Sequence, residues 1–130
     1  MSFGVFTGLH GAGVGRMREE RGQIAGDWTC DEACDLRGIV AGTVTVVAGG
    51  KLYVRGAILG DLNLADGGRV HIYGNVQGTV RVAEGAKLIH SGVVGQDLIN
   101  EGGRVFIDAS GRVMGRIRTL AGQTRTHKDP

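Results

Sequence analysis

The stretch RVHIYGNVQGTVRV, residues 69–82, alternates apolar and polar residues and is interrupted twice by glycine. Apolar residues two positions apart are typical of strands that bury one face. Glycine adopts the backbone conformations of tight bends and therefore marks the places where such strands end. No segment of the chain sustains the 3.6-residue period of an amphipathic helix. The stretch predicts short β-strands separated by bends.

The same texture repeats along most of the chain, in copies of the pattern x-G-x-apolar-x-G-x-apolar. The copies begin at residues 21, 37, 55, 73, 91 and 110, and an irregular copy begins at His10. The four starts from 37 to 91 are each separated by 18 residues, and the copy at 91 has its second glycine moved by one residue. A fixed period of this length is the signature of a repeat architecture.

Within one copy, numbered 1 to 18, apolar residues recur at positions 4, 8, 10, 16 and 18, and glycine recurs at positions 2, 6, 13 and 14. Three strands and three bends per copy describe one coil of a parallel β-helix, whose coils stack about 4.8 Å apart so that equal positions form ladders. We therefore expect an all-β, single-stranded parallel β-helix of about six coils. Position 16 is expected to stack Leu36, Leu52, Val70, Leu88 and Val105.

The departures from the repeat predict where the coils are irregular. The β-helix is expected over residues 21–122, after an N-terminal cap and irregular first coil in residues 1–20 and before a polar tail in residues 123–130. The coil that starts at Arg21 is about two residues short, and the coil that starts at Ser91 is one residue short. Imperfect terminal coils are common because the end of a stack has to limit further strand pairing.

Composition excludes several other classes of protein. The chain has 130 residues, which suits one domain. Its 25 glycines occur with a single proline and without a strict triplet period, which excludes collagen. The formal net charge of +2 requires no acidic partner. The sequence shows no apolar run long enough to span a bilayer and no secretory signal pattern, so a cytoplasmic protein is expected.

The stretches GRVHIYGNVQGTVRVAEGAKL and DASGRVMGRIRT resemble the bactofilins, which are polymer-forming cytoskeletal proteins of bacteria. The resemblance covers roughly residues 37–119, and the closing stretch is its most specific part. It implies a right-handed β-helix that assembles end to end into filaments without a nucleotide. The repeat texture itself is shared by several families of β-helix.

The sequence offers few groups for catalysis or metal binding. Cys30 and Cys34 form a C-x3-C half-site, but a tetrahedral zinc site needs four converging ligands. Cys30 falls at inward position 10 and is interpreted as a small apolar core residue. His90 falls at inward position 18 and is interpreted as a buried, hydrogen-bonded histidine. The chain has no phosphate loop, nucleophile elbow or HExxH stretch, so no cofactor, no metal and no enzymatic activity are expected.

The outward positions of the strands predict an interaction face. Position 15 is basic in four successive coils, and position 17, with position 1 of the following coil, adds aromatic and aliphatic residues. The face consists of Lys51, Tyr53, Arg55, Arg69, His71, Tyr73, Lys87, Ile89, Arg104 and Phe106. Asp66, Glu84 and Glu101 each lie three residues before a basic residue of this face. This spacing predicts a surface ion pair between each acid and the base that follows it. Aligned large apolar residues favour a contact surface instead.

The expected partner of this face is a protein, either a second copy of the chain or a different molecule. Nucleic acid is disfavoured by the low aromatic content and the balancing acids. The N-terminal residues Phe3, Val5, Phe6 and Leu9 predict a weak membrane contact. Two hypotheses remain open: a bactofilin-like assembly protein, and a stand-alone β-helix that binds a partner, for example as an inhibitor or immunity protein for a toxin.

Overall fold

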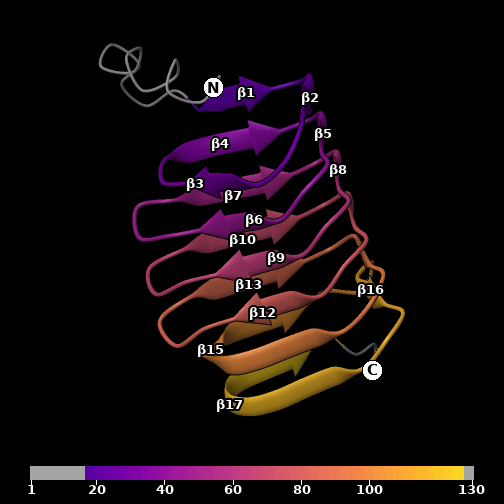
Figure 1. Ribbon diagram of the computed structural model, residues 1–130. Helices are drawn as coiled ribbons and strands as arrows, with labels where there is room; N and C mark the ends of the chain where they lie inside the picture. The colour runs from indigo at the N-terminus through magenta and orange to yellow at the C-terminus, as the bar shows by residue number, and fades with distance from the viewer. Residues whose placement is uncertain (1–16, 128–130) are drawn as a thin grey trace.

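The computed structural model describes residues 17–127, which form a parallel β-helix of about six turns and contain no helix. Each full coil contributes one strand to each of three parallel ladders, so the chain winds into the solenoid shown in Figure 1. The expected fold class is confirmed.

The first ladder contains the four-residue strands together with the three-residue β1, and it runs along one side of the solenoid. Its strands are β1 (Arg18–Glu20), β4 (Ala33–Leu36), β7 (Lys51–Val54), β10 (Arg69–Ile72), β13 (Lys87–His90) and the second halves of β15 (Leu98–Ile107) and β17 (Ile117–Thr126). The second ladder contains β3 (Trp28–Cys30), β6 (Val44–Val46), β9 (Leu62–Leu64), β12 (Val80–Val82) and the first halves of β15 and β17. The third ladder contains the two-residue strands β2 (Gln23–Ile24), β5 (Ile39–Val40), β8 (Ala57–Ile58), β11 (Asn75–Val76), β14 (Val93–Val94) and β16 (Arg112–Val113).

The pairing register follows the 18-residue repeat. Val70 pairs with Leu52 on one side and with Leu88 on the other, each 18 residues away. Because side chains alternate along a strand, this register places the apolar columns of positions 4, 8, 10, 16 and 18 on the inner face. The fully buried members from the three ladders include Leu36, Leu52, Ile58, Leu62, Ile72, Leu88 and Leu98.

One inward column differs from the expectation. Cys34 pairs with Leu52, and Leu36 pairs with Val54, so Cys34 occupies position 16 and Leu36 occupies position 18. The two missing residues of this coil are removed from the turn after Cys30, and β4 then resumes in register at Ala33. The prediction that Leu36 belongs to position 16 is therefore wrong, and Cys34 is a core residue.

The bends are tight because each coil lies directly on the one before it. A methyl group on Gly56 would overlap the carbonyl oxygen of Gly38 in the preceding coil, and Gly74 stands in the same relation to Gly56. Position 2 therefore requires a residue without a side chain wherever another coil lies beneath it.

The coil that starts at Ser91 shows how the fold absorbs a missing residue. β15 turns the corner between the second and first ladders as one continuous strand, where earlier coils have a loop (Figure 1). Asn100 is buried at this corner, and its side-chain oxygen accepts hydrogen bonds from the backbone N–H groups of Gly102 and Gly103. Its Nδ2 donates to the carbonyl oxygens of Gly103 and Gln123.

The solenoid extends beyond the boundary expected from the sequence. β17 pairs with β15 from Ile117 to Thr126, four residues past the expected end at Gly122. Residues 123–126 therefore belong to the last coil and not to a polar tail. The sequence did not indicate this because threonine replaces the aliphatic residues of the repeat at the inward positions of this coil.

Candidate interaction surfaces

The outward side of the first ladder carries two columns of side chains. We call Lys51, Arg69, Lys87 and Arg104 the basic column, and Tyr53, His71, Ile89 and Phe106 the ring column. Residues of each column are direct register partners on neighbouring strands. All four basic residues are exposed, and the ring column is half-buried except for Phe106, which is exposed. The structure thus brings the predicted face together on one side of the solenoid.

Two grooves lie along these columns. A groove of about 220 Å³ is lined by residues of both columns between Lys51 and Ile89. A second groove of about 340 Å³ continues from Lys87 past Phe106 to Arg125 on the last coil. The two grooves share Lys87, so they follow the solenoid axis as neighbours.

The aromatic residues of this face pack mainly against one another. The rings of His71 and Tyr73 are stacked with their centroids 3.9 Å apart, and Tyr53 lies edge-on to both. The guanidinium of Arg55 lies 4.6 Å from the centroid of the Tyr73 ring, a cation–π contact. Because these ring faces are occupied, they offer little surface on which nucleic-acid bases could stack.

A chain of hydrogen bonds holds His71 at the edge of the cluster. The Ser91 hydroxyl donates to Asp108 at 2.5 Å, and His71 Nε2 lies 3.1 Å from the same hydroxyl oxygen. Since the single hydroxyl proton goes to Asp108, His71 Nε2 is the donor in the second bond. The bond from Ser91 lowers the pKa of Asp108, which makes this carboxylate a poor base. The arrangement orients side chains and does not activate Ser91 as a nucleophile.

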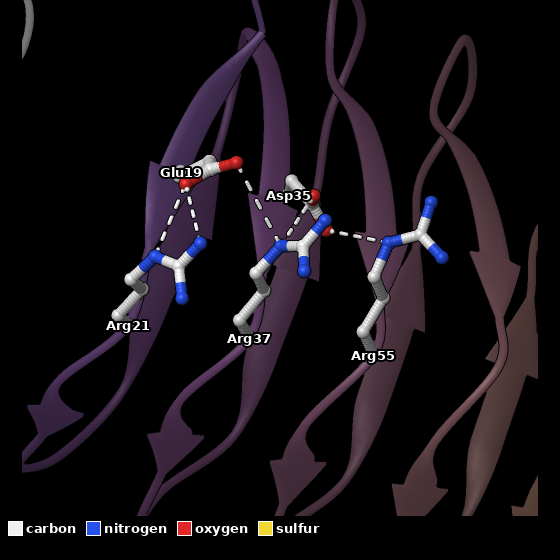
Figure 2. Close-up of polar contacts among 5 residues, drawn as sticks. All are labelled: Glu19, Arg21, Asp35, Arg37 and Arg55. Carbon is white, nitrogen blue, oxygen red and sulfur yellow. Dashed lines mark hydrogen bonds and ion pairs between the residues drawn. The ribbon is translucent and has the colours of Figure 1, made fainter.

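Ion pairs join the first three coils at the other end of this side (Figure 2). Asp35 is buried and receives Arg37 Nε at 3.0 Å and Arg55 Nε at 3.1 Å. Glu19 lies 3.1 Å from Arg21 Nη2 and 3.8 Å from Arg37 Nε. The sequence analysis missed this network, although its signal is present: Glu19 and Asp35, at position 17 of successive coils, are each followed two residues later by an arginine at position 1 of the next coil.

The basic column, in contrast, forms no ion pair with any residue of the described range 17–127. The expected pairs with Asp66, Glu84 and Glu101 are absent there, and Glu101 instead lies 3.7 Å from Arg81 of the preceding coil. The prediction of ion pairs along this corner is wrong. Asp66 and Glu84 lie on turns, and Glu101 lies at the corner of β15, whereas each basic residue lies three residues later on the first ladder; in the described range no ion pair joins them.

The last coil presents an edge that the sequence analysis did not single out. β17 is ten residues long and pairs with β15 on one side, and none of the described residues pairs with its other side. Large apolar side chains on this coil are exposed: Ile117 is 47% exposed and Leu120 is 64% exposed. Buried members of the Ile117 column, such as Leu98, are fully covered by the coil that follows them.

The two cysteines and His90 lie inside the core. Burial raises the pKa of the Cys30 thiol to about 11 and that of Cys34 to about 12. His90 Nε2 lies 2.8 Å from the carbonyl oxygen of Arg112, as expected for a hydrogen-bonded core histidine, and Nδ1 has no partner. Burial lowers the pKa of His90. Among residues 17–127, no group of three or more histidine, cysteine or acidic side chains could hold a metal ion.

No family model matches the chain, and no curated protein and no solved structure matches it either. None of the described elements is a helix long and apolar enough to cross a membrane. The predicted membrane contacts Phe3, Val5, Phe6 and Leu9 lie outside the described residues.

Proposed function

We propose that this chain is a non-enzymatic structural protein that self-associates end to end, in the manner implied by its resemblance to the bactofilins. The observation that carries the proposal is the open edge of β17. A long strand whose backbone groups are unpaired on one side is a template for pairing with another strand. In this proposal an edge strand of a second copy adds to β17 and continues the ladders.

The chemistry of the last coil supports a contact that can also be exposed. Its inward residues include Thr119 and Thr124, whose hydroxyl groups lie 2.8 Å apart and form a hydrogen bond. Threonine keeps the branched shape that packs in a strand, but its hydroxyl tolerates water. Ile117 and Leu120 add apolar surface beside these hydroxyls. Such a mixture suits an end that is wetted in the single molecule and covered in the assembly.

Sedimentation velocity over a wide concentration range, with electron microscopy of the same samples, tests this proposal. The native chain is expected to form end-to-end oligomers or filaments, and Ile117→Asp is expected to abolish this end-to-end association, because it places a charge where the end of the second copy would pack. Leu59→Asp is the matched control: Leu59 is also an exposed aliphatic residue, at 42%, but it lies on the side of the solenoid. A native chain that stays monomeric at every concentration would contradict the proposal.

The grooved face of the first ladder supports a second candidate function, binding of a separate protein by a single solenoid. Its groove of about 340 Å³ and the exposed Phe106 beside it are features of a docking surface. Under this alternative the substitution Phe106→Asp would abolish binding of the partner, whereas Ile117→Asp would leave it unchanged. An inhibitor or immunity protein would act in this way.

A further inference from the structure

Two columns of opposite charge run side by side along one corner of the solenoid. The basic column lies on the strands of the first ladder. Asp66 and Glu84 lie on the turns before β10 and β13, and Glu101 lies where β15 passes the same corner as a continuous strand; we call these three residues the acidic column. These turns stack along the left edge of Figure 1. In three successive coils an exposed acid therefore precedes an exposed base by three residues.

Neither column is neutralised by the other. No ion pair joins them among residues 17–127, and Glu101 has only its 3.7 Å contact with Arg81, in which its side chain stays 42% exposed. The same side of the solenoid shows that the chain does neutralise stacked charges elsewhere, since Asp35 binds Arg37 and Arg55 directly. Like charges that repeat about every 4.8 Å repel one another, so each bare column favours a partner of opposite charge.

The two columns together limit what that partner can be. An acidic peptide or a nucleic acid would be attracted to the basic column but repelled by the acidic column beside it. A complementary surface must carry an acidic and a basic column with the same spacing along the axis. When it faces this corner, its acidic column must lie opposite the basic column and its basic column opposite the acidic one. A second copy of this chain is such a surface.

We propose that two copies of this chain pair side by side and in parallel, about a two-fold axis that runs along the solenoid. This operation exchanges the order of the two columns and leaves every coil at its own height, so that acid meets base in each coil. A two-fold axis perpendicular to the solenoid would bring acid onto acid. The contacts, each made twice, are Asp66 with Arg69, Glu84 with Lys87, and Glu101 with Arg104 of the second copy.

This lateral pairing adds to the end-to-end association proposed above and does not depend on it, because it uses the corner turns and not the open edge of β17. Exposed ion pairs are individually weak and are screened by salt, so the lateral dimer is weak and depends strongly on ionic strength. Where solenoids are joined end to end, each copy contributes its own set of charge pairs, and the sets of joined copies act together.

The test is made in the Ile117→Asp chain, so that end-to-end association does not contribute. The base-reversed variant carries Arg69→Glu, Lys87→Glu and Arg104→Glu. The acid-reversed variant carries Asp66→Lys, Glu84→Lys and Glu101→Lys. Sedimentation equilibrium is measured for each variant and for their equimolar mixture, and melting curves followed by circular dichroism establish that each is folded.

The Ile117→Asp chain is expected to dimerise at low salt, with a dissociation constant about tenfold higher at an ionic strength near 0.3 M. Each reversed variant is expected to be monomeric alone, because both sets of contacts become repulsive. Their mixture is expected to restore the dimer. Should a reversed variant fail to fold, the milder set Arg69→Gln, Lys87→Gln and Arg104→Gln is expected to weaken the dimer about tenfold without adding negative charge.

A control separates paired columns from general attraction between oppositely charged molecules. The variant with Arg112→Glu, Arg116→Glu and Arg118→Glu has the same net charge as the base-reversed variant, but its columns are native. Mixed with the acid-reversed variant it is expected to bind more weakly, because half of the contacts repel. Equal binding in this mixture, dimerisation of the acid-reversed variant alone, or an Ile117→Asp chain that is monomeric at low salt would each overturn the lateral pairing.

Discussion

At the scale of single residues, the core holds polar and titratable groups whose properties follow from burial. Cys30 and Cys34 lie on inward positions on either side of one turn, and Cys30 donates its thiol proton toward the carbonyl oxygen of Glu32 at 3.1 Å. A thiolate in this place would lose hydration and would be repelled by the Glu32 carboxylate, and the attraction of Arg18 for Cys34 does not offset the burial. Their pKa values of about 11 and about 12 keep both thiols protonated at neutral pH.

Both thiols are therefore expected to resist alkylation in the folded protein. Because the thiolate is the nucleophile, labelling by iodoacetamide near neutral pH should be slower than in urea by roughly two orders of magnitude. Mass spectrometry of labelled peptides measures the two residues separately. Rapid labelling of Cys30 or Cys34 in the native protein would show that this turn opens or that the thiols are activated.

His90 predicts how stability depends on pH. Burial lowers its pKa in the folded state below the ordinary value of 6.5, although the Arg112 carbonyl and Asp108 act in the opposite direction. The unfolded chain therefore binds a proton more readily than the folded chain. The free energy of unfolding should be constant above about pH 6.5 and should fall as the pH drops below it, by at most about 1.4 kcal/mol per pH unit for this proton. The lowered pKa of His71 acts in the same direction.

Urea unfolding measured between about pH 7.5 and about pH 5 tests this sign. Ile72 and Ile107 are the register partners of His90 on the neighbouring strands, so His90→Ile introduces the residue type that this inward column already holds. The substitution should remove part of the dependence of the unfolding free energy on pH. His71→Gln should remove a further part. A free energy of unfolding that rises as the pH falls through this window would contradict the assignment of His90 as a buried neutral residue.

At the scale of strands and bends, the glycine columns set how closely two coils approach. Gly56→Ala is expected to lower the free energy of unfolding by about 1–3 kcal/mol or more, because the new methyl group overlaps the carbonyl oxygen of Gly38. Gly22 holds the same position in the first described coil, and a methyl group there meets no described atom within 4 Å. Gly22→Ala should change stability by less than about 1 kcal/mol, so equal losses in the two variants would contradict this account.

The strands themselves could be predicted from the sequence to different degrees. Where the repeat is intact, as in β9 and β10, alternation and glycine spacing determine both the strand and its inward face. The pattern failed where a coil departs from 18 residues, because a deletion can be absorbed at any of three bends. In the coil at Arg21 it is absorbed in the turn before Ala33, which makes Cys34 inward. In the coil at Ser91 the side chain of Asn100 replaces the missing backbone contacts.

At the scale of the whole molecule, side faces and ends differ in what the sequence could predict. The basic column and the ring column were predicted, because a solenoid places equal positions in line. Their missing ion pairs were not, because sequence spacing does not give the directions in which side chains leave a turn. The open end was also missed, because threonines replace the aliphatic residues of the repeat in β17. Ile117 is an aliphatic residue like most buried members of its column, so the sequence gives no sign that it is exposed.

The central claim is that the free edge of β17 is where copies of this chain join. Amide hydrogen exchange of peptides covering residues 117–126, measured at increasing protein concentration, tests it most directly. Backbone N–H groups on the unpaired side of an edge strand exchange quickly, and they become protected when another strand pairs with that side. We predict that protection of β17 rises with concentration in step with sedimentation, while β9 and β10 remain unchanged. Assembly in which β17 still exchanges as fast as it does at the lowest concentration would contradict the claim.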